Sequence, residues 1–404
     1  DNRDENMGFL SKTLLPDGTE IPGTNFDYNY LQHRKVDVVS SALDFILPFE
    51  KYKITAGAKV SFTNTRNGIN YDTSDPTLVQ DDYFRYKEQI YALYADYSRE
   101  FSERFSMQLG LRMEHTRTTG ISEAKDTEDK HDYTRLFPTV YLLYSPTDGH
   151  ALNFSFSNRI SRPSQNMVNP FPFYQNKYTY ACGREDLKPS YTYNAELGYT
   201  LKNNFNVSAY YSYSDDVFFQ VVDLDAETNV TSFLWENFMK THAFGLNNSY
   251  TFRTKWLQAY AQHGVSYRRT TSSAVTTSPE EQGWAYDASL RNTFFFNEKK
   301  TLLATLSGSY SSRQYQGIYL MSPTYSVSAG MLYRLLDNKL NLSLNVNNLF
   351  VSHSKLETMS NGLKIIADNQ FSFTSFRIGV SYTFGGDIRS KGQRNSNEDI
   401  QRRL

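Results

Sequence analysis

The residues that could carry catalysis are scattered along this 404-residue chain rather than grouped. Its histidines fall near expected loops, turns and strand ends, without the short spacing of a metal site. The seven are His33, His115, His131, His150, His242, His263 and His353. No HExxH, GxSxG or Walker-type glycine loop is present. We therefore predict that the protein is not an enzyme, with a hydrolase as the weakest alternative.

Acidic side chains gather in two expected loops, where carboxylate oxygens could hold Ca²⁺. The two groups are Asp72, Asp75, Asp81 and Asp82, and Asp223, Asp225 and Glu227. Ordinary solvated loop charge explains both groups, so we predict no metal and no cofactor. The single cysteine, Cys182, excludes an intrachain disulfide and any metal site built on several thiolates.

Aromatic side chains beside polar donors are suited to binding sugars, peptides or chelates. Several lie in expected loops, and these form our ligand-binding candidates: Trp235, Arg313, Tyr315, Tyr319, Tyr174 and Tyr178. A scaffold role is the alternative for Tyr174 and Tyr178, which share the longest loop. The other candidates come from different loops, so a fold must bring them together.

The composition indicates what kind of fold positions these residues. Aromatic residues make up 15% of the chain, yet hydrophobic residues reach only 39% and the mean hydropathy is -0.58. No window approaches the roughly 20 apolar residues of a transmembrane helix, so a membrane protein of this composition must cross with strands. The formal net charge of -1 gives no sign of a nucleic-acid partner.

The last apolar segment, residues 371–384, alternates with a period of two from Phe376 on. Successive side chains of a strand point to opposite faces, so one face here is apolar and the other polar. The predicted lipid-facing residues are Phe376, Ile378, Val380, Tyr382 and Phe384. Between them stand Arg377, Gly379, Ser381 and Thr383. About nine alternating residues match a tilted membrane-spanning strand.

The same pattern recurs along the chain, with short and long connections in strict alternation. That alternation is typical of a transmembrane β-barrel, whose periplasmic turns are short and whose external loops are long. We count about fifteen strands in an all-β, antiparallel fold. Over residues 36–47, 83–97 and 136–144 the pattern does not decide which side chains face the lipid and which face the lumen. The charges expected to line the lumen are Lys59, Arg112, Glu114, Arg159 and Glu196.

The strand count has a consequence for the organisation of the chain. Fifteen is odd, whereas single-chain bacterial barrels usually close with an even number. We therefore expect further barrel strands upstream of Asp1. The expected division is a polar loop segment over residues 1–35, the C-terminal part of an outer-membrane barrel over 36–386, and a polar periplasmic tail over 387–404.

Several motifs resemble the barrel of TonB-dependent outer-membrane receptors, in the branch called the outer-membrane β-barrel family. The strongest is residues 152–201, where the run RISRP (residues 159–163) is followed by NPF (169–171), LKP (187–189) and the pattern NxELxY (194–199). Supporting stretches are FSMQLGLRMEHT, LNLSLNVNNLF and the terminal SFRIGVSYTFGG. The resemblance covers nearly the whole chain.

The resemblance implies a 22-stranded barrel around an N-terminal plug, preceded by a segment that binds TonB. The fifteen visible strands then correspond to the eighth to twenty-second, with the plug absent from the given sequence. The implied function is a receptor that binds a solute at the cell surface and imports it by TonB-driven plug remodelling. Its partners would be the outer-membrane lipid, TonB and a surface lipoprotein. The alternative is a passive barrel or surface-adhesion protein of the same architecture.

Overall fold

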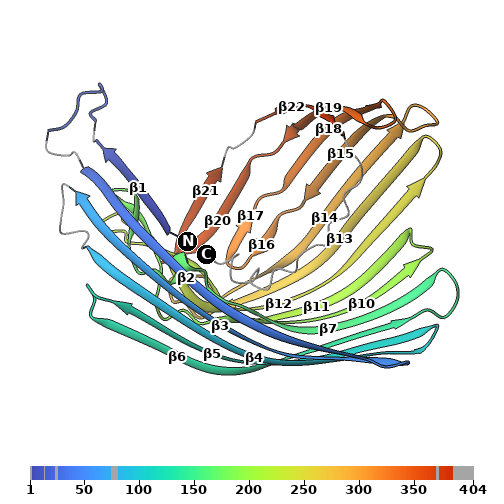
Figure 1. The fold of residues 1–404 in the computed structure, drawn as a ribbon. Helices are drawn as coiled ribbons and strands as arrows, with labels where there is room; N and C mark the ends of the chain where they lie inside the picture. The colour runs from blue at the N-terminus through green and yellow to red at the C-terminus, as the bar shows by residue number, and fades with distance from the viewer. Residues whose placement is uncertain (1, 13, 23–25, 74–80, 370–372, 385–404) are drawn as a thin grey trace.

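Antiparallel strands make up nearly the whole of the computed structural model, which describes residues 2–12, 14–22, 26–73, 81–369 and 373–384 (Figure 1). From β2 onward, fifteen strands follow one another through a single curved sheet, and each pairs with the next of these strands along the chain. They are β2 (Phe26–Pro48), β3 (Tyr52–Thr73), β4 (Asp82–Ser102), β5 (Phe105–Ser122), β6 (Thr127–Tyr144), β7 (His150–Ser161), β10 (Ser190–Leu201), β11 (Phe205–Leu224), β12 (Thr231–Arg253), β13 (Leu257–Ser272), β14 (Glu280–Phe295), β15 (Leu302–Ser311), β18 (Thr324–Leu335), β19 (Leu340–Val351) and β22 (Ser375–Tyr382). The predicted all-β class and the count of about fifteen strands are confirmed.

The pairing register keeps apolar side chains together on the outer face. Leu47 lies opposite Ile54, Ile54 opposite Tyr97, and Tyr97 opposite Leu109. Directly opposed residues of an antiparallel pair share a face, so the apolar set continues from strand to strand. The register also resolves the facing of β2, because its odd-numbered residues, such as Leu43, point outward and its even-numbered ones inward. A shift by one residue would turn every one of these side chains to the other face.

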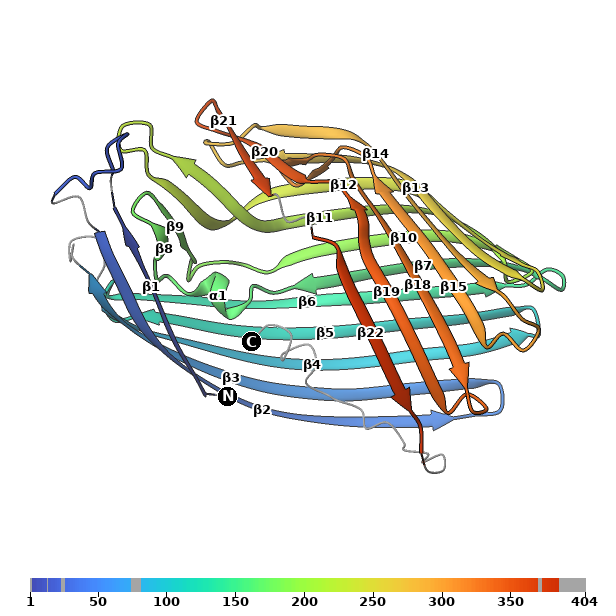
Figure 2. The ribbon, with the colours of Figure 1, turned by 90° about the horizontal axis from the view of Figure 1, so that it is seen from above.

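The sheet curls into an open trough over the described residues (Figures 1 and 2). Within this part of the chain, β22 pairs only with β19, and the half of β2 beyond Lys35 pairs only with β3. β22 and the lower half of β2 are thus the two edges of the trough. Phe371, where we expected the last strand to begin, and the tail over 387–404 lie outside the described residues.

The first 35 residues differ from the predicted polar loop. β1 (Asn2–Ser11) pairs with β2, from Asn2 opposite Lys35 to Ser11 opposite Phe26. β1 contacts only the upper half of β2, beyond the apolar band, so its outer face needs no hydrophobic alternation. The sequence pattern that reveals the other strands is therefore missing from it.

Several predicted loops are also strands, for the same reason. β3 continues to Thr73, β5 to Ser122 and β11 to Leu224, well past the ends of their apolar alternation. Hydrogen bonding to neighbouring strands satisfies the backbone there, and above the bilayer the outer face no longer needs an apolar residue at every second position. The long-loop side of the sheet therefore rises as a wall of paired strands.

The remaining elements belong to loops on this long side. They are α1 (Gln165–Val168), β8 (Phe173–Asn176), β9 (Thr179–Cys182), β16 (Gln314–Gln316), β17 (Tyr319–Met321), β20 (Ser354–Ser360) and β21 (Leu363–Asn369). The last four form a separate sheet of their own. No helix in the described residues is long and apolar enough to cross a membrane. Figure 2 shows α1, β8 and β9 inside the curve of the main sheet.

Candidate functional site

The loop that carries α1, β8 and β9 is held against the inner wall by a cluster of aromatic side chains, here called the anchoring cluster. Its buried members are Phe26, Tyr28, Tyr30, Ile69, Phe84, Tyr86, Val168, Phe171, Tyr174 and Leu187. The rings of Tyr28 and Tyr174 lie 5.3 Å apart, and those of Phe84 and Phe171 lie 6.4 Å apart. This packing fixes the position of the loop, because each ring buries a large apolar area between wall and loop.

Backbone contacts reinforce the anchoring cluster. The hydroxyls of Tyr28 and Tyr71 both donate to the carbonyl oxygen of Pro172, at 3.1 and 3.2 Å. The Cys182 thiol donates to the carbonyl of Pro170 at 3.1 Å, and burial raises the pKa of this thiol. Cys182 is half-buried, and a raised pKa disfavours the thiolate that a reactive cysteine needs, so its visible contact is the one that ties β9 to Pro170.

An ion network on the inner wall centres on Arg162, at the start of the same loop. Arg162 Nη2 lies 2.6 Å from Glu114 Oε2, and Arg162 Nε lies 3.9 Å from Glu88 Oε1. Arg112 Nε binds the other oxygen of Glu114 at 2.5 Å. The side chains of Arg162, Glu114 and Glu88 are all buried. Buried charges of this kind are stable only when paired, so the loop and the wall depend on each other.

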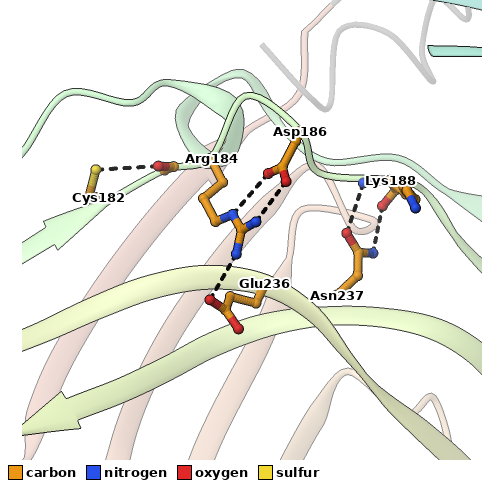
Figure 3. A network of polar contacts seen from close by, with 7 residues as sticks. Cys182, Arg184, Asp186, Lys188, Glu236 and Asn237 are labelled. Carbon is orange, nitrogen blue, oxygen red and sulfur yellow. Dashed lines mark hydrogen bonds and ion pairs between the residues drawn. The ribbon is translucent and has the colours of Figure 1, made fainter. Parts of the chain in front are cut away.

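A second ion network fastens the end of this loop to β12 (Figure 3). Arg184 binds Asp186 through two hydrogen bonds, at 2.9 and 2.7 Å, and reaches Glu236 Oε1 at 2.8 Å. The hydrogen bonds from Arg184 hold the pKa of the Asp186 carboxyl below its usual range. The side-chain amide of Asn237 pairs with the backbone of Lys188, donating at 2.9 Å and accepting at 2.8 Å.

Loops from four other hairpins join above β11 and β12 to form what we call the joined cap. Its core contains Val221, Val222, Phe238, Met239, Ile318 and Tyr319. The tip of the β20–β21 hairpin, Asn361–Gly362, has positive φ angles of 50° and 78°, as a type I′ turn requires. Asn361 donates to Asp223 Oδ1 at 2.8 Å, to the Leu224 carbonyl at 3.2 Å and, from its backbone, to the Thr276 carbonyl at 2.8 Å.

An exposed ion cluster lies on the opposite face of the small sheet in the joined cap. Lys364 Nζ and Arg313 Nη2 approach the same oxygen, Glu357 Oε2, at 2.9 and 3.5 Å. The hydrogen bond from Lys364 lowers the pKa of Glu357, which therefore stays ionised. These three residues line a cavity of about 410 Å³ together with Leu320, Ser322 and Pro323.

The predicted ligand-binding residues fall into two groups. Tyr174 and Tyr319 are buried core residues, and Trp235 is half-buried between the two clusters. Burial raises the pKa of Tyr319 to about 12, and its hydroxyl donates to the Gln220 carbonyl at 2.8 Å. Arg313 and Tyr178 are exposed at the surface. Tyr315 is half-buried beside Gly283 of β14.

The predicted lumen-lining charges all lie on the inner face of the sheet. Lys59, Arg112, Glu114 and Arg159 line one cavity of about 720 Å³, and Glu196 lines a separate cavity of about 190 Å³. Sequence reasoning did not assign Glu88, Arg184, Glu357 or Lys364 to any site. Glu88 meets Arg162, Arg184 meets Glu236 and Glu357 meets Arg313 across long stretches of the chain, so only the fold shows these contacts.

The predicted lipid-facing residues lie on the outer face of β22 and just beyond its end. Ile378 is 79% exposed and Val380 is 69% exposed in this chain alone. Ile378 lies opposite Leu344, and Leu344 opposite Met331, so this apolar face extends across β19 and β18. An apolar face of this extent would be unstable in water, and it is suited to lipid.

The described residues contain no group of three His, Cys, Asp or Glu side chains placed to hold a metal ion. The Asp225 carboxylate instead accepts hydrogen bonds from the backbone of Glu227 and the hydroxyl of Thr228, at 2.8 and 2.7 Å. These bonds lower the pKa of Asp225 and close the tip of the β11–β12 hairpin. Asp75, of the other acidic group, lies outside the described residues.

The curved sheet with an apolar outer face, a polar inner face and loops anchored inside its curve agrees with the family comparison. The Outer membrane protein beta-barrel family matches residues 1–382. The chain belongs to this family. It is therefore a protein of the cell outer membrane, and the resemblance read from its motifs is confirmed. No curated protein matches the sequence.

Solved structures of other outer-membrane proteins have a fold similar to that of this chain. The copper transporter OprC aligns with a TM-score of 0.62 at 13% identity, over 95% of this chain and 61% of that one. The ferric citrate transporter FecA gives 0.59 at 13% identity, with 95% and 61% covered. The ferric yersiniabactin uptake receptor FyuA from Yersinia pestis gives 0.59 at 15% identity, with 89% and 56% covered. The chain thus spans little more than half the length of these structures.

Proposed function

We propose that this protein is part of a receptor that binds a solute at the cell surface and imports it across the outer membrane. The observation that supports this proposal is the arrangement of its long loops. They fold inward and are fixed by buried packing and ion networks, at the anchoring cluster and in the joined cap. An adhesive surface would instead present its loops outward, and a passive pore would leave its inner wall open.

The energy source that we propose is TonB, acting on a plug domain outside the given sequence. The charged side chains of the inner wall favour a plug, because they offer partners to a polar domain that fills the lumen. FecA and FyuA are named for ferric chelates, and OprC for copper. We therefore take metal chelates as the first solutes to test. A surface lipoprotein that delivers solute to the mouth stays a prediction.

An uptake assay in two matched hosts tests this function. The full-length gene product is expressed in outer-membrane-bearing cells with and without TonB, and accumulation of radiolabelled ferric chelates and of oligosaccharides is measured. We expect one solute to accumulate only when TonB is present. Equal accumulation in both hosts would indicate a passive barrel, and cell attachment without accumulation would indicate an adhesin.

A further inference from the structure

The ion cluster of the joined cap holds more positive than negative charge. Two cations, Arg313 and Lys364, approach a single carboxylate oxygen of Glu357. The distance from Arg313, 3.5 Å, exceeds that of a charge-assisted hydrogen bond. Among the described residues, no hydrogen bond from the Arg313 guanidinium is found, although this group carries five donors. Its side chain is 61% exposed. The guanidinium group of Arg313 can therefore bind a second carboxylate.

The neighbouring charged residues lie outside the lining of this cavity. On the same face, Lys355 pairs with Asp368 at 3.2 Å, which leaves that pair neutral. Glu281 of β14 lies near the Tyr315 hydroxyl and does not line the cavity. The cavity itself is thus lined by two cations and one anion. The Glu357 carboxylate shows the position at which Lys364 and Arg313 stabilise an anionic group.

The shape of the cavity adds an apolar contact to the charged one. Leu320 lies directly opposite Glu357 in the register of β17 and β20, so the two side chains share a face. Leu320 and Pro323 form the apolar part of a lining whose volume, about 410 Å³, is that of a small-molecule site. The site therefore suits a compact solute with an acidic end and a less polar body.

We propose that Arg313 and Lys364 form a subsite for a carboxylate of the imported solute, with Leu320 and Pro323 contacting its body. This inference rests on the proposed function and names the chemistry of the solute. Arginine binds a carboxylate through two parallel hydrogen bonds, a geometry that Glu357 does not use here. A lipopolysaccharide phosphate would offer similar charge. The cavity lies on the small sheet within the joined cap rather than on the outer apolar face, which favours a solute carboxylate.

Titration calorimetry on the full-length protein in detergent tests the subsite, with citrate as the carboxylate probe. We expect Arg313→Gln and Lys364→Gln each to weaken citrate binding about tenfold, the equivalent of one charged hydrogen bond. Glu357→Gln removes the competing carboxylate, so citrate should bind several-fold more tightly. Lys355→Gln is the matched control, because it alters a cation of the same hairpin outside the cavity, and it should leave the affinity unchanged.

The opposite changes in affinity make the test decisive. A gain of binding in Glu357→Gln cannot result from misfolding, whereas a loss in that variant would overturn the proposal. Equal weakening of citrate binding by Lys355→Gln would indicate an effect of general surface charge, and would also overturn the proposal.

If purified lipopolysaccharide displaces citrate through the same residues and binds more tightly, the subsite belongs to a lipid phosphate instead. Citrate binding without TonB-dependent uptake would reject the proposed function alone, and uptake without citrate binding would reject the subsite alone.

Discussion

Arg162 shows how a single buried charge can hold a long loop in place. Its side chain and those of Glu114 and Glu88 are each at most 10% exposed. Removing one partner of such a buried group leaves the other charges uncompensated in a poorly solvated site. The position of the loop over residues 162–189 therefore depends on the charge of this one residue.

We expect Arg162→Gln to destabilise the protein by about 3–5 kcal/mol. Arg159→Gln is the control, because Arg159 is an exposed arginine on the same strand end, and its replacement should cost no more than about 0.5 kcal/mol. Urea unfolding in detergent micelles measures both changes. Equal stability of the two variants would show that the network around Arg162 does not hold the loop.

Acid should loosen the junction between Arg184 and Asp186. The folded pKa of Asp186 is depressed, so its contribution to stability is present above the unfolded pKa and is lost as pH falls through the folded pKa. Limited proteolysis of the loop between pH 7 and pH 3 measures this. We expect Asp186→Asn to be cleaved more readily at pH 7 but to lose part of the acid dependence. An acid response identical to that of the unmodified protein would contradict this assignment.

At the scale of the element, Gly183 is required by close approach rather than by its φ angle. A Cβ at this position would lie 2.3 Å from the Asn169 carbonyl oxygen and 2.6 Å from that of Met167. Both are backbone atoms, which cannot rotate away. Gly183 therefore allows β9 to pass the end of α1, and this contact fixes the fold of the anchored loop.

We expect Gly183→Ala to cost about 1–3 kcal/mol, as overpacking of a fixed backbone does. Gly68→Ala is the matched control, because the nearest atom to its added Cβ would be a Tyr83 ring carbon at 3.7 Å, an ordinary contact. Thermal unfolding in detergent compares the two variants. If the two variants have the same melting temperature, the loop can shift to accept the extra carbon.

The two faces of β22 should respond differently to a charge. Val380→Arg places a cation on the outer, apolar face, and near the bilayer midplane this costs about 2–4 kcal/mol. Ser381→Arg places the same charge on the inner, polar face, where water can solvate it. Folding yield into lipid vesicles measures the difference, and equal yields would mean that the two faces have been assigned the wrong way round.

At the scale of the whole molecule, the sequence predicts the barrel but not the structure above it. The period of two identifies fifteen strands because lipid demands an apolar residue at every second position. That demand ends where the strand leaves the bilayer, so the period of two does not reveal β1 or the upper half of β2. The ligand candidates show the same limit. Tyr319 and Arg313 look alike as loop residues, and only packing shows that one is buried and the other exposed.

The barrel itself predicts how the protein behaves outside the membrane. We expect heat-modifiable migration on a gel, together with strand-rich circular dichroism in detergent, because the sheet resists unfolding until it is heated. A protein that stays soluble and monomeric without detergent would contradict the assignment of the outer apolar face to lipid.

The tip of the β20–β21 hairpin has a consequence for how other organisms recognise this cell. Asn361 ties its own hairpin to the end of β11 at Asp223 and to the loop that contains Thr276, and the small sheet adds the segment around Tyr319. An antibody or a bacteriophage would therefore meet a composite epitope assembled from four distant stretches of the chain. A peptide copied from any one of those stretches should be a poor immunogen, whereas the folded protein should elicit antibodies that fail on a denatured blot.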